Sequence, residues 1–138
     1  MRSRSKRARR PGTGGPAPSY SDAMQLLHIA HRADWQDSLR DGTYTVSTRG
    51  RTLEEVGFIH ASYPEQVAAV AQLVYRDDPE PLCVLILEES LIQQDGVRIA
   101  LEDGGDGELY PHVYGPIRRS WVVDVRPARF DEDGRLVF

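Results

Sequence analysis

An unbroken run of six apolar residues, Leu82 to Leu87 (LCVLIL), restricts the fold of this chain more than any other feature. Successive side chains of a β-strand point to opposite faces of the sheet, so a strand of apolar residues alone must be covered on both faces. The run therefore predicts a central, sandwiched strand. It is far shorter than the roughly 20 apolar residues that cross a bilayer, which excludes a membrane protein.

The single cysteine of the chain, Cys83, lies inside this run. One cysteine excludes a disulfide scaffold and a zinc site made of cysteines alone. We expect Cys83 to be a small buried hydrophobe and not an activated nucleophile. The sequence also lacks G-x-S-x-G, G-x-G-x-x-G and G-x-x-x-x-G-K-[ST], which excludes serine hydrolases of the elbow type, dinucleotide folds and P-loop proteins.

Charge divides the chain into a basic tail and an acidic domain. Six of its 17 basic residues fall in the first ten positions, and no acidic residue precedes Asp22. Residues 1–23 cannot bury enough apolar surface to fold, so we expect a disordered tail, or a natural start at Met24. The tail could contact nucleic acid weakly, whereas the acidic domain, residues 24–138, would repel phosphates. The tail also lacks the apolar region of a secretory signal, and we expect a cytoplasmic protein.

Strands outnumber helices in the predicted pattern of this single domain. Apolar or alternating segments predict strands at 25–30, 58–61, 82–87, 97–101 and 121–125, and a closing hairpin from 129–130 to 136–138. Helices are expected at 33–40, with Trp35 and Leu39 on one face, and after Ser62, which has capping-box spacing to Glu65. Thr52 to Val56 predicts one helical turn closed by Gly57.

The remaining segments, 90–96, 102–108 and 109–117, are expected to form turns and loops, since glycine, proline or acidic residues interrupt them. The order of elements predicts an α+β domain with a mostly antiparallel, strongly twisted sheet and one long helix after the second strand. Only residues 58–87 resemble a βαβ unit.

Three of the four histidines occupy unusual positions: His28 and His60 lie within predicted strands, and His112 lies in YPHVYG. We expect the fourth, His31, at the surface. An imidazole is costly to bury without partners for its nitrogens. Each histidine alone would fit a hydrogen-bonded structural role, but three in one small domain favour a shared cleft. A three-histidine zinc site is an alternative, although no local H-x-H or H-x-x-x-H pair supports it, and we expect no metal.

Other side chains could complete such a cleft. Tyr110, Tyr114 and Gly115 belong to a proline-rich segment whose aromatic rings could stack on a planar ligand or simply plug the edge of the sheet. Ser47 and Ser62 could donate to a ribose or phosphate oxygen. The acidic segment from Glu102 to Glu108 offers carboxylates, or a solvated loop.

Several segments together resemble the domain of unknown function 952 family: LLHIA, Trp35, Tyr44-x-x-Ser47, GFIHAS, LYPHVYGPI and WVVDV. The resemblance covers about Gln25 to Val125, and GFIHAS and PHVYGPI are its most specific parts. It implies a fold similar to that of the ADP-ribosyltransferases, with a split sheet. The histidines of the first two strands are also similar in order to those in the catalytic lobe of RNA 2′-phosphotransferases.

The resemblance implies a small nucleotide-type ligand, NAD or a relative, lying across the split sheet. His28 would then hydrogen-bond the nicotinamide ribose, and Tyr110 or Tyr114 would stack on the nicotinamide. Glu102, or else Glu108, would stabilise positive charge on the ribose as the glycosidic bond breaks. His60 or His112 would move a proton. The alternative is a non-enzymatic module that binds a small ligand or a protein on the same fold.

Overall fold

The computed structural model describes residues 24–138, so the predicted basic tail lies outside the described residues. The helices are α1 (Arg32–Asp41), α2 (Leu53–Val56), α3 (Val67–Tyr75) and α4 (Glu89–Gln94), with a 3₁₀ helix at Arg119–Trp121. The strands are β1 (Gln25–His31), β2 (Thr43–Tyr44), β3 (Val46–Thr48), β4 (Arg51–Thr52), β5 (Ile59–His60), β6 (Leu82–Glu88), β7 (Ile99–Asp103), β8 (Leu109–Val113), β9 (Ile117–Arg118), β10 (Val122–Phe130) and β11 (Leu136–Val137). Within residues 24–138, no helix has the length and apolar character needed to span a membrane.

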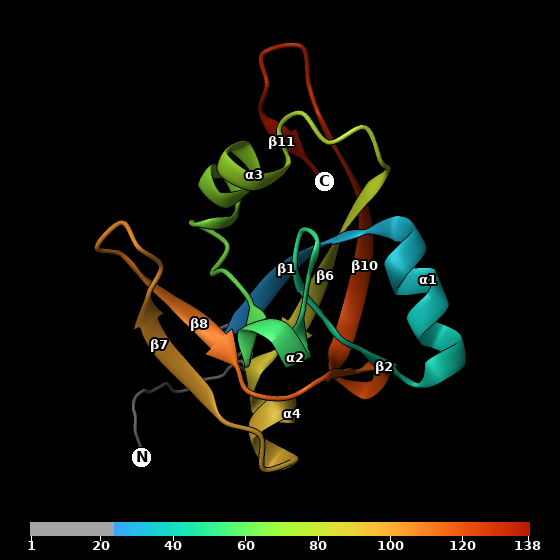
Figure 1. The fold of residues 1–138 in the computed structure, drawn as a ribbon, viewed down its shortest axis with the longest axis vertical. Coiled ribbons are helices and arrows are strands. Elements are labelled where there is room, and N and C mark those ends of the chain that lie inside the picture. The colour runs from blue at the N-terminus through green and yellow to red at the C-terminus, as the bar shows by residue number, and fades with distance from the viewer. Residues whose placement is uncertain (1–23) are drawn as a thin grey trace, which may run out of the picture.

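Two larger antiparallel sheets organise the domain, beside the two-stranded pairs β2-β9 and β3-β4, which confirms the α+β class and the antiparallel pairing (Figure 1). One sheet has the order β1-β6-β10-β11, and the other has the order β5-β8-β7. The sheets meet through an isolated bridge between Leu27 of β1 and Ser62, which exchange two backbone hydrogen bonds of 2.7 and 2.9 Å. Beyond this bridge β1 and β5 separate, and the sheet is split at that point.

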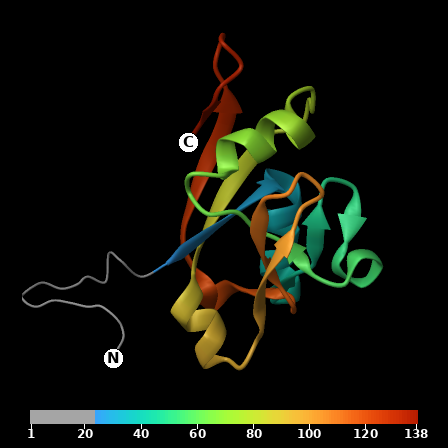
Figure 2. The same ribbon diagram turned by 90° about the vertical axis from the view of Figure 1, so that its left-hand side faces the viewer.

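The apolar run forms β6, and both of its faces are covered, as predicted. Cys83, Leu85 and Leu87 face a core shared with α1, α4 and the β5–β8 strands. Leu82, Val84 and Ile86 face a second core, closed by Val67, Ala71 and Tyr75 of α3. Figure 2 shows α3 lying across the strands of the larger sheet. The alternation along β6 follows from the two-residue period of a strand.

The helical turn at α2 was predicted correctly, whereas the start of α3 was not. Thr52 and Glu55 form a capping box, and Gly57 closes the turn at φ 99°. Ser62 does not cap α3, because its backbone is engaged in the bridge to β1, and the helix begins only at Val67. In α1 the prediction that Leu39 shares a buried face with Trp35 is wrong: Leu39 is exposed, and Ser38 is buried beside Trp35 instead.

The predicted βαβ unit is also wrong, because β5 and β6 belong to different sheets. The helix expected after the strand at 58–61 is present as α3, but it is not the one long helix of the domain, since α1 is one residue longer. Segment 90–96 is largely α4, and the strand predicted at 121–125 continues without a break to Phe130. Connectivity between sheets depends on long-range contacts, which local patterns do not specify.

Residues 109–117 form strands β8 and β9, not the predicted loop, although β8 contains Pro111. The carbonyl of Pro111 accepts a hydrogen bond of 3.2 Å from the N–H of Ala61. The backbone groups of one strand residue point to the same side, so the missing N–H of Pro111 also faces the β5 side. That N–H would have met the carbonyl of Ala61, so the β5 ladder ends at His60 and the ladder to β7 on the other side keeps all of its hydrogen bonds.

Cys83 is 1% exposed, which confirms its predicted burial, and burial raises the pKa of its thiol to about 11. The thiolate is the reactive form. We therefore expect a thiol reagent at pH 8 to label the native protein at least tenfold more slowly than the urea-unfolded chain, followed by absorbance of the released thiolate. Equal labelling rates in the two states would contradict the buried position.

Candidate functional site

A cleft lies where the edge of β1 separates from the smaller sheet, beside the bridge to Ser62. Its volume is about 260 Å³, open solvent included. β1, β3, β5, the segment after β5 and α3 contribute its walls, through Leu27, His28, Ile29, Ser47, Thr48, His60, Ser62, Val70 and Tyr75. Four of the side chains predicted for a site, His28, Ser47, His60 and Ser62, thus line one hollow.

His28 lies at the base of this cleft with both ring nitrogens engaged. Its Nδ1–H donates to the carbonyl of His60 at 2.5 Å, and its Nε2 accepts from the Tyr44 hydroxyl at 3.1 Å. The ring is 2% exposed, and this burial lowers the pKa of His28 to about 4. His28 is therefore a neutral imidazole at pH 7 that ties β1 to β5 across the split.

The other two histidines form a cluster with Glu102. The rings of His60 and His112 meet edge to face, with centroids 4.8 Å apart, and His112 stacks on Phe58 at 3.9 Å. Nδ1–H of His112 donates to Oε1 of Glu102 at 2.8 Å, and the Tyr114 hydroxyl donates to the same oxygen at 2.6 Å. Both hydrogen bonds lower the pKa of Glu102, and the bond from Tyr114 has the larger effect.

Nε2 of His112 is buried and has no hydrogen-bond partner in the part of the chain that the structure describes. An unpaired buried polar atom costs about 1–3 kcal/mol, so such groups tend to persist where function needs them. With Nδ1–H committed to a carboxylate, Nε2 carries the lone pair. The arrangement matches the carboxylate–imidazole pair of general-base sites.

His60 connects this cluster to the cleft, because it lines the cleft and contacts His112. It is half-buried, and burial together with the charge of His112 lowers its pKa. The three histidines are thus contiguous: His28 bonds the backbone of His60, and His60 touches His112. His31, expected at the surface, is instead partly buried, with Nε2 2.6 Å from Asp78.

The remaining predicted site residues lie as follows. The Ser47 hydroxyl donates to the carbonyl of Phe58 at 2.5 Å. Tyr110 turns away into the β7–β8 turn, where its hydroxyl donates to Asp106 at 2.8 Å. Gly115 packs beside Val97 and, like Tyr110, does not line the cleft.

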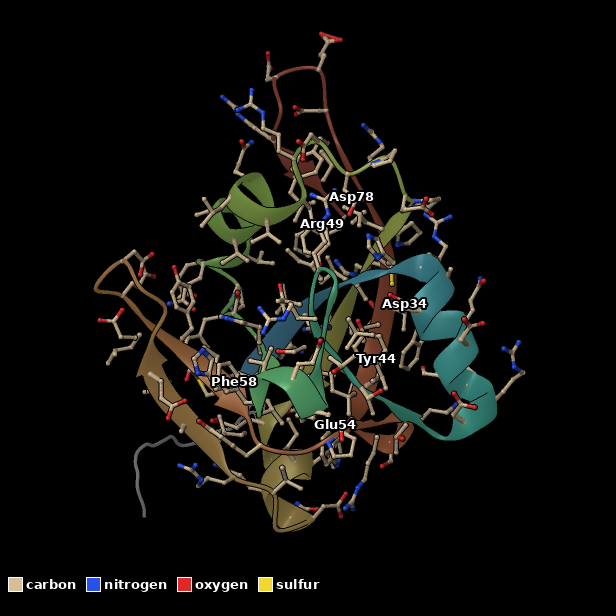
Figure 3. The ribbon with its side chains drawn as sticks, in the orientation of Figure 1. Asp34, Tyr44, Arg49, Glu54, Phe58 and Asp78 are labelled. Atoms are coloured by element: carbon tan, nitrogen blue, oxygen red, sulfur yellow. The ribbon has the colours of Figure 1, made fainter. Side chains whose placement is uncertain are left out.

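Sequence reasoning missed several residues of the site, of which Phe58, Tyr75 and Thr48 are the main ones. Phe58 is the platform under His112, and its position two residues before His60, on the same face of a strand, was the available signal. Tyr75 lines the cleft from the end of α3. Arg49 stands at the β3–β4 turn, with Nε 2.8 Å from Asp78, and Figure 3 shows the two side chains together at the tip of that hairpin.

No group of three histidine, cysteine, aspartate or glutamate side chains within residues 24–138 is arranged to hold a metal ion. The His60–His112–Glu102 cluster is arranged for hydrogen bonding instead, because one nitrogen of His112 is already committed to the carboxylate. This cluster offers side chains for proton transfer and polar recognition.

Comparison with known proteins gives the family. The model of the DUF952 family, described as protein of unknown function, matches residues 29–125. The crystal structure of protein CC0527 from Caulobacter crescentus is similar at 26% identity and a TM-score of 0.68, covering 82% of this chain and 93% of that one. Its solution NMR structure is similar at 27% identity and a TM-score of 0.64, covering 80% and 90%. No curated protein matches. With most of its domain matched by the family model, this chain belongs to the DUF952 family.

Proposed function

We propose that this domain is ADP-ribosyltransferase-like, binds NAD or a related nucleotide in the cleft, and cleaves or transfers ADP-ribose. The observation that carries the proposal is the position of the cleft: it opens where the two sheets split, and His60 joins it to the Glu102–His112 pair. Ligands commonly bind where sheet strands diverge and polar groups converge on an apolar hollow.

The size of the cleft limits how much of the ligand it holds. Pockets for whole drug-sized ligands have volumes of roughly 300–1,000 Å³. This cleft is shallow, and its 260 Å³ includes open solvent, so it holds only a small part of such a ligand and the rest of a dinucleotide would extend over the surface. Ser62 and Thr48 would offer hydroxyl groups to the ribose, and His28 would reach it by exchanging its bond to Tyr44. Of the two tyrosines, Tyr114 is the nearer to this cluster, through Glu102.

A second candidate function is ligand binding without turnover. No carboxylate is among the residues that line the cleft, and Glu102 approaches it only through His112 and His60. Stabilising the charge on a ribose needs a carboxylate near the reacting carbon. Release of nicotinamide from labelled NAD separates the enzyme from the binding module.

Binding is tested by thermal unfolding with NAD and with ADP-ribose. Ligand at ten times its Kd stabilises the native state by RT ln 11, about 1.4 kcal/mol, which corresponds to roughly 5 °C in Tm for a domain of this size. We expect His60→Ala to abolish the shift, since its ring lines the cleft. His31→Ala is the matched control, because His31 lies outside the cleft, and it should keep the shift. No shift with millimolar ligand would overturn the proposal.

A further inference from the structure

The pair formed by Glu102 and His112 has one ring nitrogen without a hydrogen-bond partner among residues 24–138, and this nitrogen suggests a role for the pair. Its carboxylate accepts two hydrogen bonds, from His112 and from Tyr114, so it is held as an anion with fixed geometry. Arg98 lies 4.1 Å above the Tyr114 ring, and its charge also favours the carboxylate. Nε2 of His112 is then the one unsatisfied position of the pair, buried and without a partner among residues 24–138.

The ring of His60 lies beside the ring of His112, with centroids 4.8 Å apart and no hydrogen bond between the two. Its ring meets the ring of His112 at an interplanar angle of 75°, while Phe58 stacks on His112 and fixes its plane. His60 also lines the cleft, so one imidazole faces both the ligand and the buried pair. An imidazole can accept a proton at one nitrogen and release one from the other.

We propose that His60, His112 and Glu102 form a proton relay that activates a hydroxyl or water nucleophile in the cleft. His60 is the catalytic residue, and His112 and Glu102 are positioning residues that act through it. The inference rests on the proposed function, and it adds the class of acceptor: a group whose O–H must lose its proton, and not a thiol or a preformed anion.

The transfer balances as follows. The nucleophile O–H gives its proton to one nitrogen of His60, and the His60 ring then turns so that the N–H at its other nitrogen passes its proton to Nε2 of His112, a contact that the 4.8 Å separation of the ring centroids brings within reach. His112 becomes an imidazolium that keeps its Nδ1–H bond to the Glu102 carboxylate. The nucleophile oxygen forms a bond to C1 of the ribose, and the bond from C1 to the nicotinamide nitrogen breaks, with its electron pair leaving on nicotinamide.

The first test compares Glu102→Gln with the matched control Asp106→Asn. Both substitutions neutralise a carboxylate of the β7–β8 hairpin that accepts a tyrosine hydroxyl, but only Glu102 also holds a histidine. For Glu102→Gln we expect nicotinamide release to fall about 100-fold or more, with the affinity for ADP-ribose within threefold of wild type. The acid limb of the pH–rate profile should also move. Asp106→Asn should leave rate and profile unchanged.

A second readout does not need turnover. Nitrogen-15 NMR of the imidazoles should show His112 as the Nδ1–H tautomer, and Glu102→Gln should shift its population toward the Nε2–H tautomer, because the charge-assisted bond to Nδ1–H is lost. An unchanged tautomer would overturn the relay, as would ADP-ribose binding without nicotinamide release. If ADP-ribose does not bind while the NMR shift is present, the nucleotide proposal fails and the relay remains for another hydroxyl substrate.

Discussion

Replacing Asp78 with alanine is expected to lower the free energy of unfolding by about 3 kcal/mol at pH 7, because it breaks a buried ionic cluster. The Asp78 side chain is 2% exposed and accepts from His31 at 2.6 Å, from Arg49 at 2.8 Å and from the N–H of Glu80 at 2.9 Å. These contacts join the end of β1, the β3–β4 hairpin and the segment after α3. We expect a loss of stability at the lower end of the range for buried ion pairs, because the side chains of His31 and Arg49 remain partly exposed to water.

The deficit of this variant should become smaller in acid. Burial raises the pKa of Asp78, but the hydrogen bonds from Glu80 and His31 and the nearby positive charges outweigh it, so the net pKa is lowered. The contribution of Asp78 is thus fully present above the pKa of an unfolded aspartate, about 3.9, and is lost as pH falls through the folded value. Urea unfolding of the wild type and of Asp78→Ala at pH 7 and at pH 3 measures how the stability deficit of the variant changes with pH.

Asp77→Ala is the matched control for Asp78→Ala. Asp77 is the neighbouring residue and also contacts Arg49, at 3.3 Å, but it is 90% exposed. Exposed ion pairs contribute about 0–1 kcal/mol, so this variant should unfold almost as wild type does at both pH values. Equal losses for the two variants would show that burial of Asp78 is not what stabilises the cluster.

Wild-type protein is expected to lose about 3 kcal/mol of stability between pH 6.5 and pH 4 through His28 alone. Burial depresses the pKa of His28 to about 4, whereas the unfolded chain titrates at about 6.5. Between these values the unfolded state binds a proton that the folded state does not. The contribution is therefore fully present above pH 6.5 and declines as pH falls toward 4, and His60, whose pKa is also lowered, adds to it in the same direction.

His28→Gln should flatten this dependence, since glutamine does not titrate, while its amide can still donate and accept. Denaturant unfolding every half pH unit from 7 to 4 gives the slope for each protein. His31→Gln serves as the comparison, because it removes a histidine from β1 that lies 2.6 Å from Asp78 and is not fully buried. The idea fails if His28→Gln retains the full wild-type loss of stability between pH 6.5 and 4.

Sequence patterns correctly predicted those elements that are stabilised by interactions between residues close together along the chain. The capped turn at α2 depends on Thr52, Glu55 and Gly57, which lie within six residues of one another, and it formed as expected. Ser62 shows the limit: its spacing to Glu65 fits a helix cap, but a strand 35 residues earlier takes its backbone instead. Pro111 shows the same limit. A proline is tolerated in a central strand only where its missing N–H falls at the end of the pairing with a neighbouring strand, and the sequence does not reveal where that pairing ends.

The residues of the candidate site were also only partly predictable from local sequence. Sequence reasoning selected His28, His60, His112 and Glu102, but it assigned Glu102 to a loop and expected His28 to hydrogen-bond a ribose. In the structure Glu102 belongs to β7, directly opposite Tyr110, and both nitrogens of His28 have partners. Which nitrogen is free depends on residues brought together from five strands, and no spacing rule encodes that.

The sequence by itself determined that β6 would be buried on both faces, that Cys83 would be inert packing, and that three imidazoles needed partners. Those conclusions follow from side-chain chemistry and the two-residue period of a strand. Only the tertiary structure decided that the sheet divides beside Ser62, that His28 is held neutral, and that His112 keeps one nitrogen unpaired. Each of these depends on contacts between residues far apart along the chain, whose geometry is fixed only when the two sheets pack.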